Sequence, residues 1–273
     1  MLWSHFIKYS KILLISSTVL IVIPASQALA AASDELSKFI AAYQPQDQQA
    51  ISNLLNEYTK SELIDSKVSV SRQTFGSENA PLSLVEWIDI QCPHCKNLNT
   101  ALNELQQMTP AESWRIESRH YPLDSECNPQ IPKSRNPGVS CLAAKALICL
   151  SDNPKLHDIR LELFNQQRFL SKDIIWATIA ESDKERSALE TCVNSAETAA
   201  VLKADIELAE KHKITGTPLV VINGRKSPAI PPIIYALILA EGDLSAEPFK
   251  ALPPPKAIEK PAHNANDGHD HSH

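Results

Sequence analysis

The chain has 273 residues and a formal net charge of −6, and 43% of its residues are hydrophobic. An intrinsically disordered chain would be poorer in apolar residues, and 6 glycines are too few for a collagen-like repeat. The acidic balance argues against a nucleic-acid partner held on a basic surface. The length fits one domain with additions, or two small domains, and either buries a sizeable core.

The first 30 residues have the pattern of a secretory signal peptide. Lys8 and Lys11 precede an apolar run over residues 12–23, and Ala28-Leu29-Ala30 supplies the small residues of a cleavage site. The run is shorter than the roughly 20 residues that span a bilayer, so cleavage after Ala30 is favoured over a retained N-terminal anchor. The mature chain is then expected in the periplasm, where thiols can form lasting disulfides.

Residues 31–66 predict an N-terminal extension of one or two amphipathic helices. Their apolar stripes are Leu36, Phe39, Ile40 and Tyr43, and then Ile51, Leu54, Leu55 and Tyr58. Short isolated helices are marginal in water, so these stripes must be buried. They either pack on the chain's own domain or pair between chains. The second interpretation is favoured here, and it predicts a homo-oligomer with isomerase or reductase capacity besides oxidase activity.

The rest of the chain predicts an α/β fold. Strand patterns over residues 82–90 and 114–121 flank a helix over 93–108, and a Pro-rich loop covers 124–138. Helical patterns then cover residues 141–150, 155–170, 172–181 and 187–213. A short strand over 219–222, an Asn223-Gly224 hairpin turn and a helix over 232–241 follow. This order predicts one domain over 67–250 with an all-helical insertion at about 125–212, and a disordered Pro- and His-rich tail over 251–273.

The sharpest motif is Cys92-Pro93-His94-Cys95, where the first strand meets the helix. Free N–H groups and the dipole at a helix start lower the pKa of a thiol, so Cys92 is the predicted nucleophile and Cys95 the resolving thiol. Pro93 suits the first helical turn, and His94 adds a donor or a positive charge beside the thiolate. The alternative is a zinc half-site, which would need a second ligand pair that the sequence lacks.

Two distant features support redox chemistry. A cis Thr217–Pro218 bond would allow a proline directly before a strand. It would also present the backbone of Thr217 to an extended peptide. The alternative is an ordinary trans proline in a loop. Glu86 lies six residues before Cys92 in an apolar strand. It is expected to point into the core and exchange a proton with Cys95, the alternative being an exposed edge position.

Residues 84–89 lead into the Cys-Pro-His-Cys motif, and Thr217-Pro218 precedes Asn223-Gly224. This arrangement resembles the thioredoxin fold of the DsbA family of periplasmic thiol–disulfide oxidoreductases. The resemblance covers about residues 68–245. It implies an exposed nucleophile at Cys92, a buried Cys95, a cis Pro218 and a buried acid at Glu86. It also implies no cofactor beyond the redox-active Cys92–Cys95 disulfide. The implied partners are unfolded or misfolded exported proteins and a membrane redox partner.

Further along the chain, Tyr121-Pro122-Leu123-Asp124 precedes Cys127-Asn128, and Gly138 precedes Cys141. This pattern resembles the DsbA-like domains found with vitamin K epoxide reductase homologues. Four further cysteines allow several disulfide pairings. A helix over 141–150 would separate Cys141 from Cys149 by ~12 Å, beyond the ~7 Å limit for bridged Cα atoms. The favoured pairs are Cys127–Cys141 and Cys149–Cys192. Cys127–Cys149 with Cys141–Cys192, or free buried thiols, stay open as alternatives.

A rival function comes from the tail. His263, His269, His271 and His273 could chelate copper, nickel or zinc through their imidazoles, which would make this a metal-handling protein with an accessory thiol site. The alternative is a solvated polar tail or a cloning remnant. The leading hypothesis remains a periplasmic protein disulfide oxidoreductase or isomerase.

Overall fold

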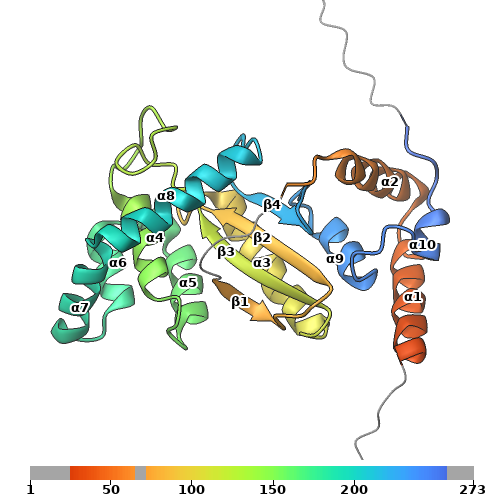
Figure 1. Ribbon diagram of the computed structural model, residues 1–273, viewed down its shortest axis with the longest axis horizontal. Helices are drawn as coiled ribbons and strands as arrows, with labels where there is room; N and C mark the ends of the chain where they lie inside the picture. The colour runs from red at the N-terminus through yellow and green to blue at the C-terminus, as the bar shows by residue number, and fades with distance from the viewer. Residues whose placement is uncertain (1–24, 65–71, 257–273) are drawn as a thin grey trace, which may run out of the picture.

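The computed structural model describes residues 25–64 and 72–256, and its centre is a five-stranded mixed sheet (Figure 1). The strand order is β1-β3-β2-β4-β5, and β2 and β3 run parallel while the other neighbours run antiparallel. The strands are β1 (Gln73–Gly76), β2 (Leu82–Ile88), β3 (Trp114–His120), β4 (Leu219–Ile222) and β5 (Arg225–Ser227). The Asn223-Gly224 turn joins β4 to β5, as its sequence predicts.

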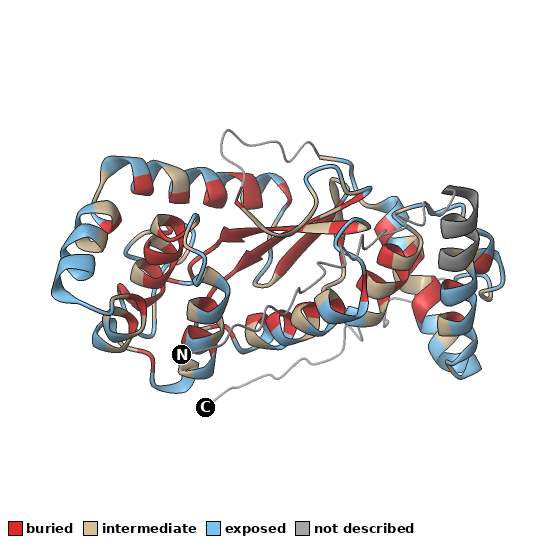
Figure 2. Cartoon of the chain, turned by 90° about the horizontal axis from the view of Figure 1, so that it is seen from below, coloured by how far each residue is buried: buried red, intermediate tan, exposed pale blue. Residues whose placement is uncertain are grey.

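Helices cover both faces of the sheet, because alternate strand residues point to opposite faces and both sets are apolar. Helices α3 (Pro93–Met108) and α9 (Pro231–Leu239) pack against one face, where Leu84 and Val220 lie. Helix α8 (Ala196–Lys211) packs against Val85 and Trp87 on the other. The three central strands β2, β3 and β4 are therefore mostly buried, and the helices bury one stripe each (Figure 2).

The segment between β3 and β4 is helical, which confirms the expected all-helical insertion. Its elements are α4 (Val139–Cys149), α5 (Leu156–Asn165), the 3-10 helix η1 (Gln167–Phe169), α6 (Lys172–Ile179), α7 (Asp183–Val193) and α8. Two breaks interrupt the expected helical patterns: the pattern over 155–170 breaks after α5, and the pattern over 187–213, expected to hold one or two helices, breaks before α8. The hydroxyl of Ser195 caps the start of α8 by accepting from the N–H of Thr198, which explains the second break.

The N-terminal extension consists of α1 (Ala25–Ala41) and α2 (Pro45–Lys60), and both pack on the same chain. Leu36 and Ile40 contact Ala236 of α9. Ile51, Leu55 and Tyr58 of α2 belong to the main core. The stripes are thus buried without a second chain, which is the alternative that the sequence analysis did not favour. The homo-oligomer stays a prediction, but the argument for it, that the stripes need a partner chain, was wrong.

Both ends of the domain differ from expectation. Helix α1 begins at Ala25, so the expected cleavage point after Ala30 falls inside it, and residues 1–24 lie outside the described residues. The expected disorder from residue 251 is wrong for 251–256, because this segment lies against α2. The hydroxyl of Ser52 donates to the carbonyl of Pro253 (2.6 Å), and the N–H of Lys256 donates to Asn53 (2.8 Å). No helix in the described ranges is long and apolar enough to cross a bilayer.

Candidate active site

The two thiols of the Cys-Pro-His-Cys motif lie where β2 passes into α3. Cys92 is the N-cap residue of α3, Pro93 takes the first helical position, and the N–H of Cys95 donates to the carbonyl of Cys92 (3.1 Å). Cys95 is fully buried and Cys92 is only 6% exposed. The implied exposed position of Cys92 is therefore wrong, whereas His94 and Pro93 are exposed.

The loop before β4 covers Cys92. Its Thr217–Pro218 peptide bond is cis, and the thiol of Cys92 lies 3.2 Å from the carbonyl oxygen of Thr217. Residues 125 positions apart in the sequence therefore meet at the reactive sulfur. A backbone carbonyl beside the sulfur is a group with which an extended peptide can pair.

The two thiols differ strongly in acidity. A hydrogen bond from the Cys95 thiol lowers the pKa of Cys92 to about 5, and N–H groups of Cys95 and His94 act in the same direction, against the opposing effect of burial. Burial raises the pKa of Cys95, and the thiolate of Cys92 adds to this. At neutral pH, Cys92 is thus a thiolate and Cys95 a thiol, which suits a nucleophile and a buried partner.

Glu86 is fully buried, so the alternative of an exposed edge position is wrong. One of its carboxylate oxygens accepts from the hydroxyl of Ser118 (2.6 Å) and pairs with Arg160 of α5 (2.6 Å). The other oxygen has no hydrogen-bond partner among the described residues, and Glu86 lines a cavity of about 180 Å³ together with Asn99. Within the described chain no hydrogen bond joins Glu86 to Cys95, so their proton exchange stays a prediction.

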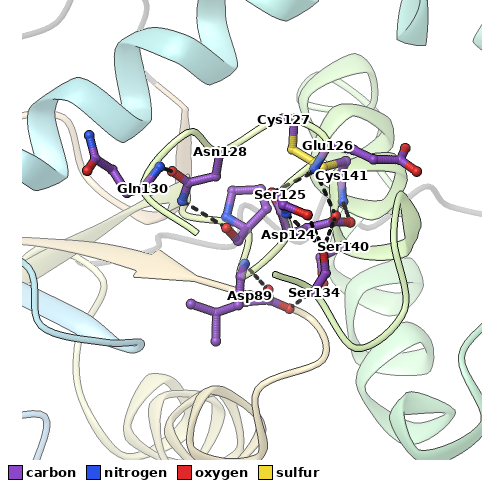
Figure 3. The surroundings of a disulfide bond; sticks show 12 residues. Asp89, Asp124, Ser125, Glu126, Cys127, Asn128, Gln130, Ser134, Ser140 and Cys141 are labelled. Atoms are coloured by element: carbon purple, nitrogen blue, oxygen red, sulfur yellow. Dashed lines mark hydrogen bonds between the residues drawn. A yellow bond between two sulfur atoms is a disulfide. The ribbon is translucent and has the colours of Figure 1, made fainter. Parts of the chain in front are cut away.

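Asp89 is a buried acid near the thiols that the sequence analysis did not single out. Its backbone N–H lies 3.5 Å from the sulfur of Cys95, and its side chain is 3% exposed. The carboxylate accepts from the hydroxyl of Ser140 (2.9 Å), near the Cys127–Cys141 disulfide (Figure 3). Its position three residues before Cys92, after a run of apolar residues, was the available signal.

The four further cysteines form two disulfides in the insertion. Cys127 is bonded to Cys141, with 5.9 Å between Cα atoms, and Cys149 to Cys192, with 6.0 Å. This is the favoured pairing, and the alternatives of Cys127–Cys149 with Cys141–Cys192 and of free buried thiols are wrong. The first disulfide closes the loop before α4, and the second joins α4 to α7.

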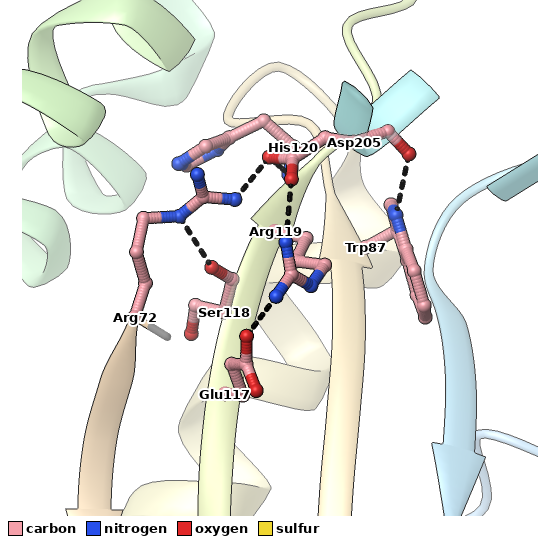
Figure 4. A network of polar contacts seen from close by, with 7 residues as sticks. All are labelled: Arg72, Trp87, Glu117, Ser118, Arg119, His120 and Asp205. Atoms are coloured by element: carbon pink, nitrogen blue, oxygen red, sulfur yellow. Dashed lines mark hydrogen bonds and ion pairs between the residues drawn. The ribbon is translucent and has the colours of Figure 1, made fainter. Parts of the chain in front are cut away.

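A second polar cluster attaches α8 to the sheet (Figure 4). Asp205 of α8 is fully buried and forms ion pairs with Arg72 and with Arg119 (2.9 Å), while its carbonyl accepts from the indole of Trp87 (2.8 Å). The neighbouring His120 has a pKa well below its ordinary value because it is buried, and the nearby arginines add to this. This cluster fixes the insertion's last helix on β2 and β3.

No group of three or more His, Cys, Asp or Glu side chains that could hold a metal occurs in residues 25–64 or 72–256. The four tail residues expected to bind metal, His263, His269, His271 and His273, lie outside the described residues. The metal-handling hypothesis therefore gains no support from the described chain.

The sheet order, the dithiol at a helix start and the cis-proline loop beside it define a thioredoxin-fold protein. Residues 68–232 match the family model described as Thioredoxin, which is more than half of the chain. The chain belongs to this thioredoxin family.

Solved structures show the same DsbA-like fold. BdbD from Bacillus subtilis is 18% identical, with a TM-score of 0.52, and covers 66% of this chain and 98% of its own. The thiol-disulfide exchange protein alpha-DsbA2 from Wolbachia pipientis is 16% identical, with a TM-score of 0.51, and covers 77% of this chain and 97% of its own. These likenesses confirm the expected DsbA-like thioredoxin fold.

Two curated relatives are much longer proteins. The Na(+)/H(+) antiporter NhaA 1 of Mycolicibacterium gilvum is 26% identical over 153 residues, which is 55% of this chain and 23% of the antiporter. NhaA 3 of Salinispora tropica is also 26% identical, over 152 residues and 21% of its length. The chain thus spans less than a quarter of either antiporter, and transport is not carried over to it.

Proposed function

We propose that the protein is a thiol–disulfide oxidoreductase that forms disulfides in exported proteins through Cys92 and Cys95. The observation that carries the proposal is the position of Cys92, which combines a pKa lowered to about 5 with a peptide carbonyl 3.2 Å from its sulfur. A low pKa makes Cys92 a good leaving group, which favours transfer of the disulfide to a substrate.

The reaction begins with the Cys92–Cys95 disulfide. A substrate thiolate attacks the sulfur of Cys92, the bond between Cys92 and Cys95 breaks, and Cys95 takes the electron pair and a proton. A second substrate thiolate then attacks the substrate sulfur of the mixed disulfide and releases Cys92 as a thiolate. The substrate thiols lose two electrons and two protons in total, and the dithiol of the protein holds the electrons.

Residues around the thiols have separate roles in this proposal. Pro93 starts α3 without an unpaired N–H, and the N–H of His94 supports the Cys92 thiolate. Thr217 and Pro218 present a backbone edge to the substrate peptide. Glu86 supplies or accepts the proton of Cys95; what supports this role is that Glu86 is a fully buried acid in β2, the strand that leads to the thiols.

The setting of the reaction is part of the proposal. The signal-peptide pattern and the two disulfides of the insertion support a periplasmic location, since such bonds persist outside the cytosol. A membrane redox partner would re-oxidise the dithiol. Isomerase activity rested on an oligomer formed by residues 31–66, and the burial of these helices on their own chain favours the oxidase direction.

The test is oxidative folding of a reduced multi-disulfide protein. Cys92→Ser should abolish disulfide formation, and Cys95→Ser should abolish it too, because neither variant can form the Cys92–Cys95 disulfide that oxidises the substrate. Asp124→Asn is the control for a general loss of structure, because the hydrogen bonds of Asp124 in the described chain go to its own loop and to Cys141, and none goes to Cys92 or Cys95. Full oxidase activity in the Cys92→Ser protein contradicts the proposal.

A further inference from the structure

The carboxylate of Asp89 joins three separate segments around the thiol site. It accepts hydrogen bonds from the N–H of Gln91 (2.5 Å) in the active-site turn, and from the N–H of Leu123 (2.5 Å) in the loop after β3. Its third donor is the hydroxyl of Ser140 (2.9 Å) in the first turn of α4 (Figure 3). One buried side chain therefore connects the turn before Cys92 to the insertion.

The backbone of Asp89 contacts the thiol residues directly. Its N–H lies 3.5 Å from the sulfur of Cys95, and its carbonyl accepts from the N–H of Cys92 (3.1 Å). Any movement of Asp89 thus changes the surroundings of both sulfurs. The side chain anchors the residue, and the backbone transmits that position to the thiols.

The charge of Asp89 also acts on the site. All three donors to its carboxylate are uncharged, so they stabilise the negative charge without neutralising it. Burial raises the pKa of Asp89, its three hydrogen bonds oppose this in part, and the Cys92 thiolate adds a smaller contribution that raises the pKa. Electrostatic interaction between two titrating groups is mutual, so the carboxylate in turn disfavours the thiolate of Cys92.

We propose that Asp89 is a positioning residue that fixes the thiol turn to the helical insertion and, through its charge, limits the oxidising power of the Cys92–Cys95 pair. A less stable thiolate is a poorer leaving group, so the dithiol form is less favoured and the disulfide is a weaker oxidant. The inference rests on the proposed function, because it concerns the same thiol pair.

The test compares Asp89→Asn with Asp124→Asn. Asp124 is a matched control because it is equally buried and accepts from Ser134 (3.0 Å) and from the N–H of Cys141 (3.2 Å), in the neighbouring loop. Two quantities are measured on the full chain: the titration of Cys92 by thiolate absorbance, and the equilibrium of the pair with glutathione.

Asp89→Asn should lower the pKa of Cys92 by half a unit or more, which corresponds to an equilibrium shift of about threefold toward the dithiol form. Asp124→Asn should lower the melting temperature and leave both quantities unchanged. Asp89→Glu should also lower the melting temperature but keep the Cys92 titration close to that of the unchanged protein, because it retains the charge.

An unchanged or raised pKa of Cys92 in Asp89→Asn overturns the inference, as does an equal shift in Asp124→Asn. If Asp89→Asn does not fold, Ser140→Ala decides the question. Losing that donor raises the pKa of Asp89, so Asp89 carries less negative charge over the pH range in which Cys92 titrates. A smaller fall in the pKa of Cys92 supports the inference, and no shift overturns it. If the unchanged protein does not equilibrate with glutathione at all, the proposed function fails instead.

Discussion

Replacing Arg160 by Met should destabilise the fold strongly, because it would leave the Glu86 carboxylate buried without its cation. The two side chains are 10% and 1% exposed and lie 2.6 Å apart. Arg160 also donates to the hydroxyl of Ser118 (2.6 Å), which itself donates to Glu86. Removing one partner of such a buried pair costs about 3–5 kcal/mol, because the remaining charge has no counter-ion.

Urea denaturation of the oxidised protein measures this loss. The midpoint should fall for Arg160→Met with an unchanged slope, and the double variant Glu86→Gln with Arg160→Met should recover at least half of the loss. Lys155→Met is the matched control, since its ion pair with Glu181 is exposed and contributes little. The reasoning is refuted if the effects of Glu86→Gln and Arg160→Met on the free energy of unfolding are strictly additive. It is also refuted if Arg160→Met loses no more stability than Lys155→Met.

Four further outcomes are expected. Alkylation of Cys92 in the reduced protein should accelerate through about pH 5 and level off by about pH 7, with Cys95 unlabelled; a rate still rising at high pH contradicts the lowered pKa. Since that pKa is lowered from 9.0, the Cys92 thiolate stabilises the reduced fold, and this stabilisation is complete at high pH. It is lost as the pH falls through about 5. Thermal melting of the reduced protein at several pH values, compared with Cys92→Ser, would show this loss. Replacing Cys149 and Cys192 by Ser should cost about 4 kcal/mol in urea denaturation, because the bond closes a long loop; no loss would show that the bond does not form. Tyr58→Phe should cost about 1 kcal/mol, as it removes a buried hydrogen bond to β4, and an unchanged midpoint would show that this bond contributes nothing.

Local patterns predicted most of the sheet and the thiol motif. The apolar runs of β2, β3 and β4 and the Cys-x-x-Cys pair carry their signals within a few residues. Strand β1 was missed because its four residues are only half-buried and contain Gly76. It is a strand because it pairs with β3, and that partner lies far along the chain.

The polar contacts of the site were harder to predict for a related reason. The burial of Glu86 could be expected from the apolar strand around it, but its partner Arg160 lies 74 residues further on, in a helix of ordinary polar pattern. The position of Asp89 three residues before Cys92 indicates that it lies near the thiols, but its contacts could not be predicted, because its donors are mostly backbone N–H groups, which every sequence has. The amphipathic stripes of α1 and α2 similarly indicate that they are buried, but not against which surface.

The order of the cysteines along the chain has a consequence for how the protein matures. Cys92 and Cys95 come first, Cys127 and Cys141 follow, and Cys149 and Cys192 come last, so each pair is complete before the next begins. A chain that is oxidised while it crosses a membrane from its N-terminus always offers the correct partner as the nearest free thiol. The native bonds can therefore form in sequence without reshuffling, and the protein needs no isomerase for its own folding.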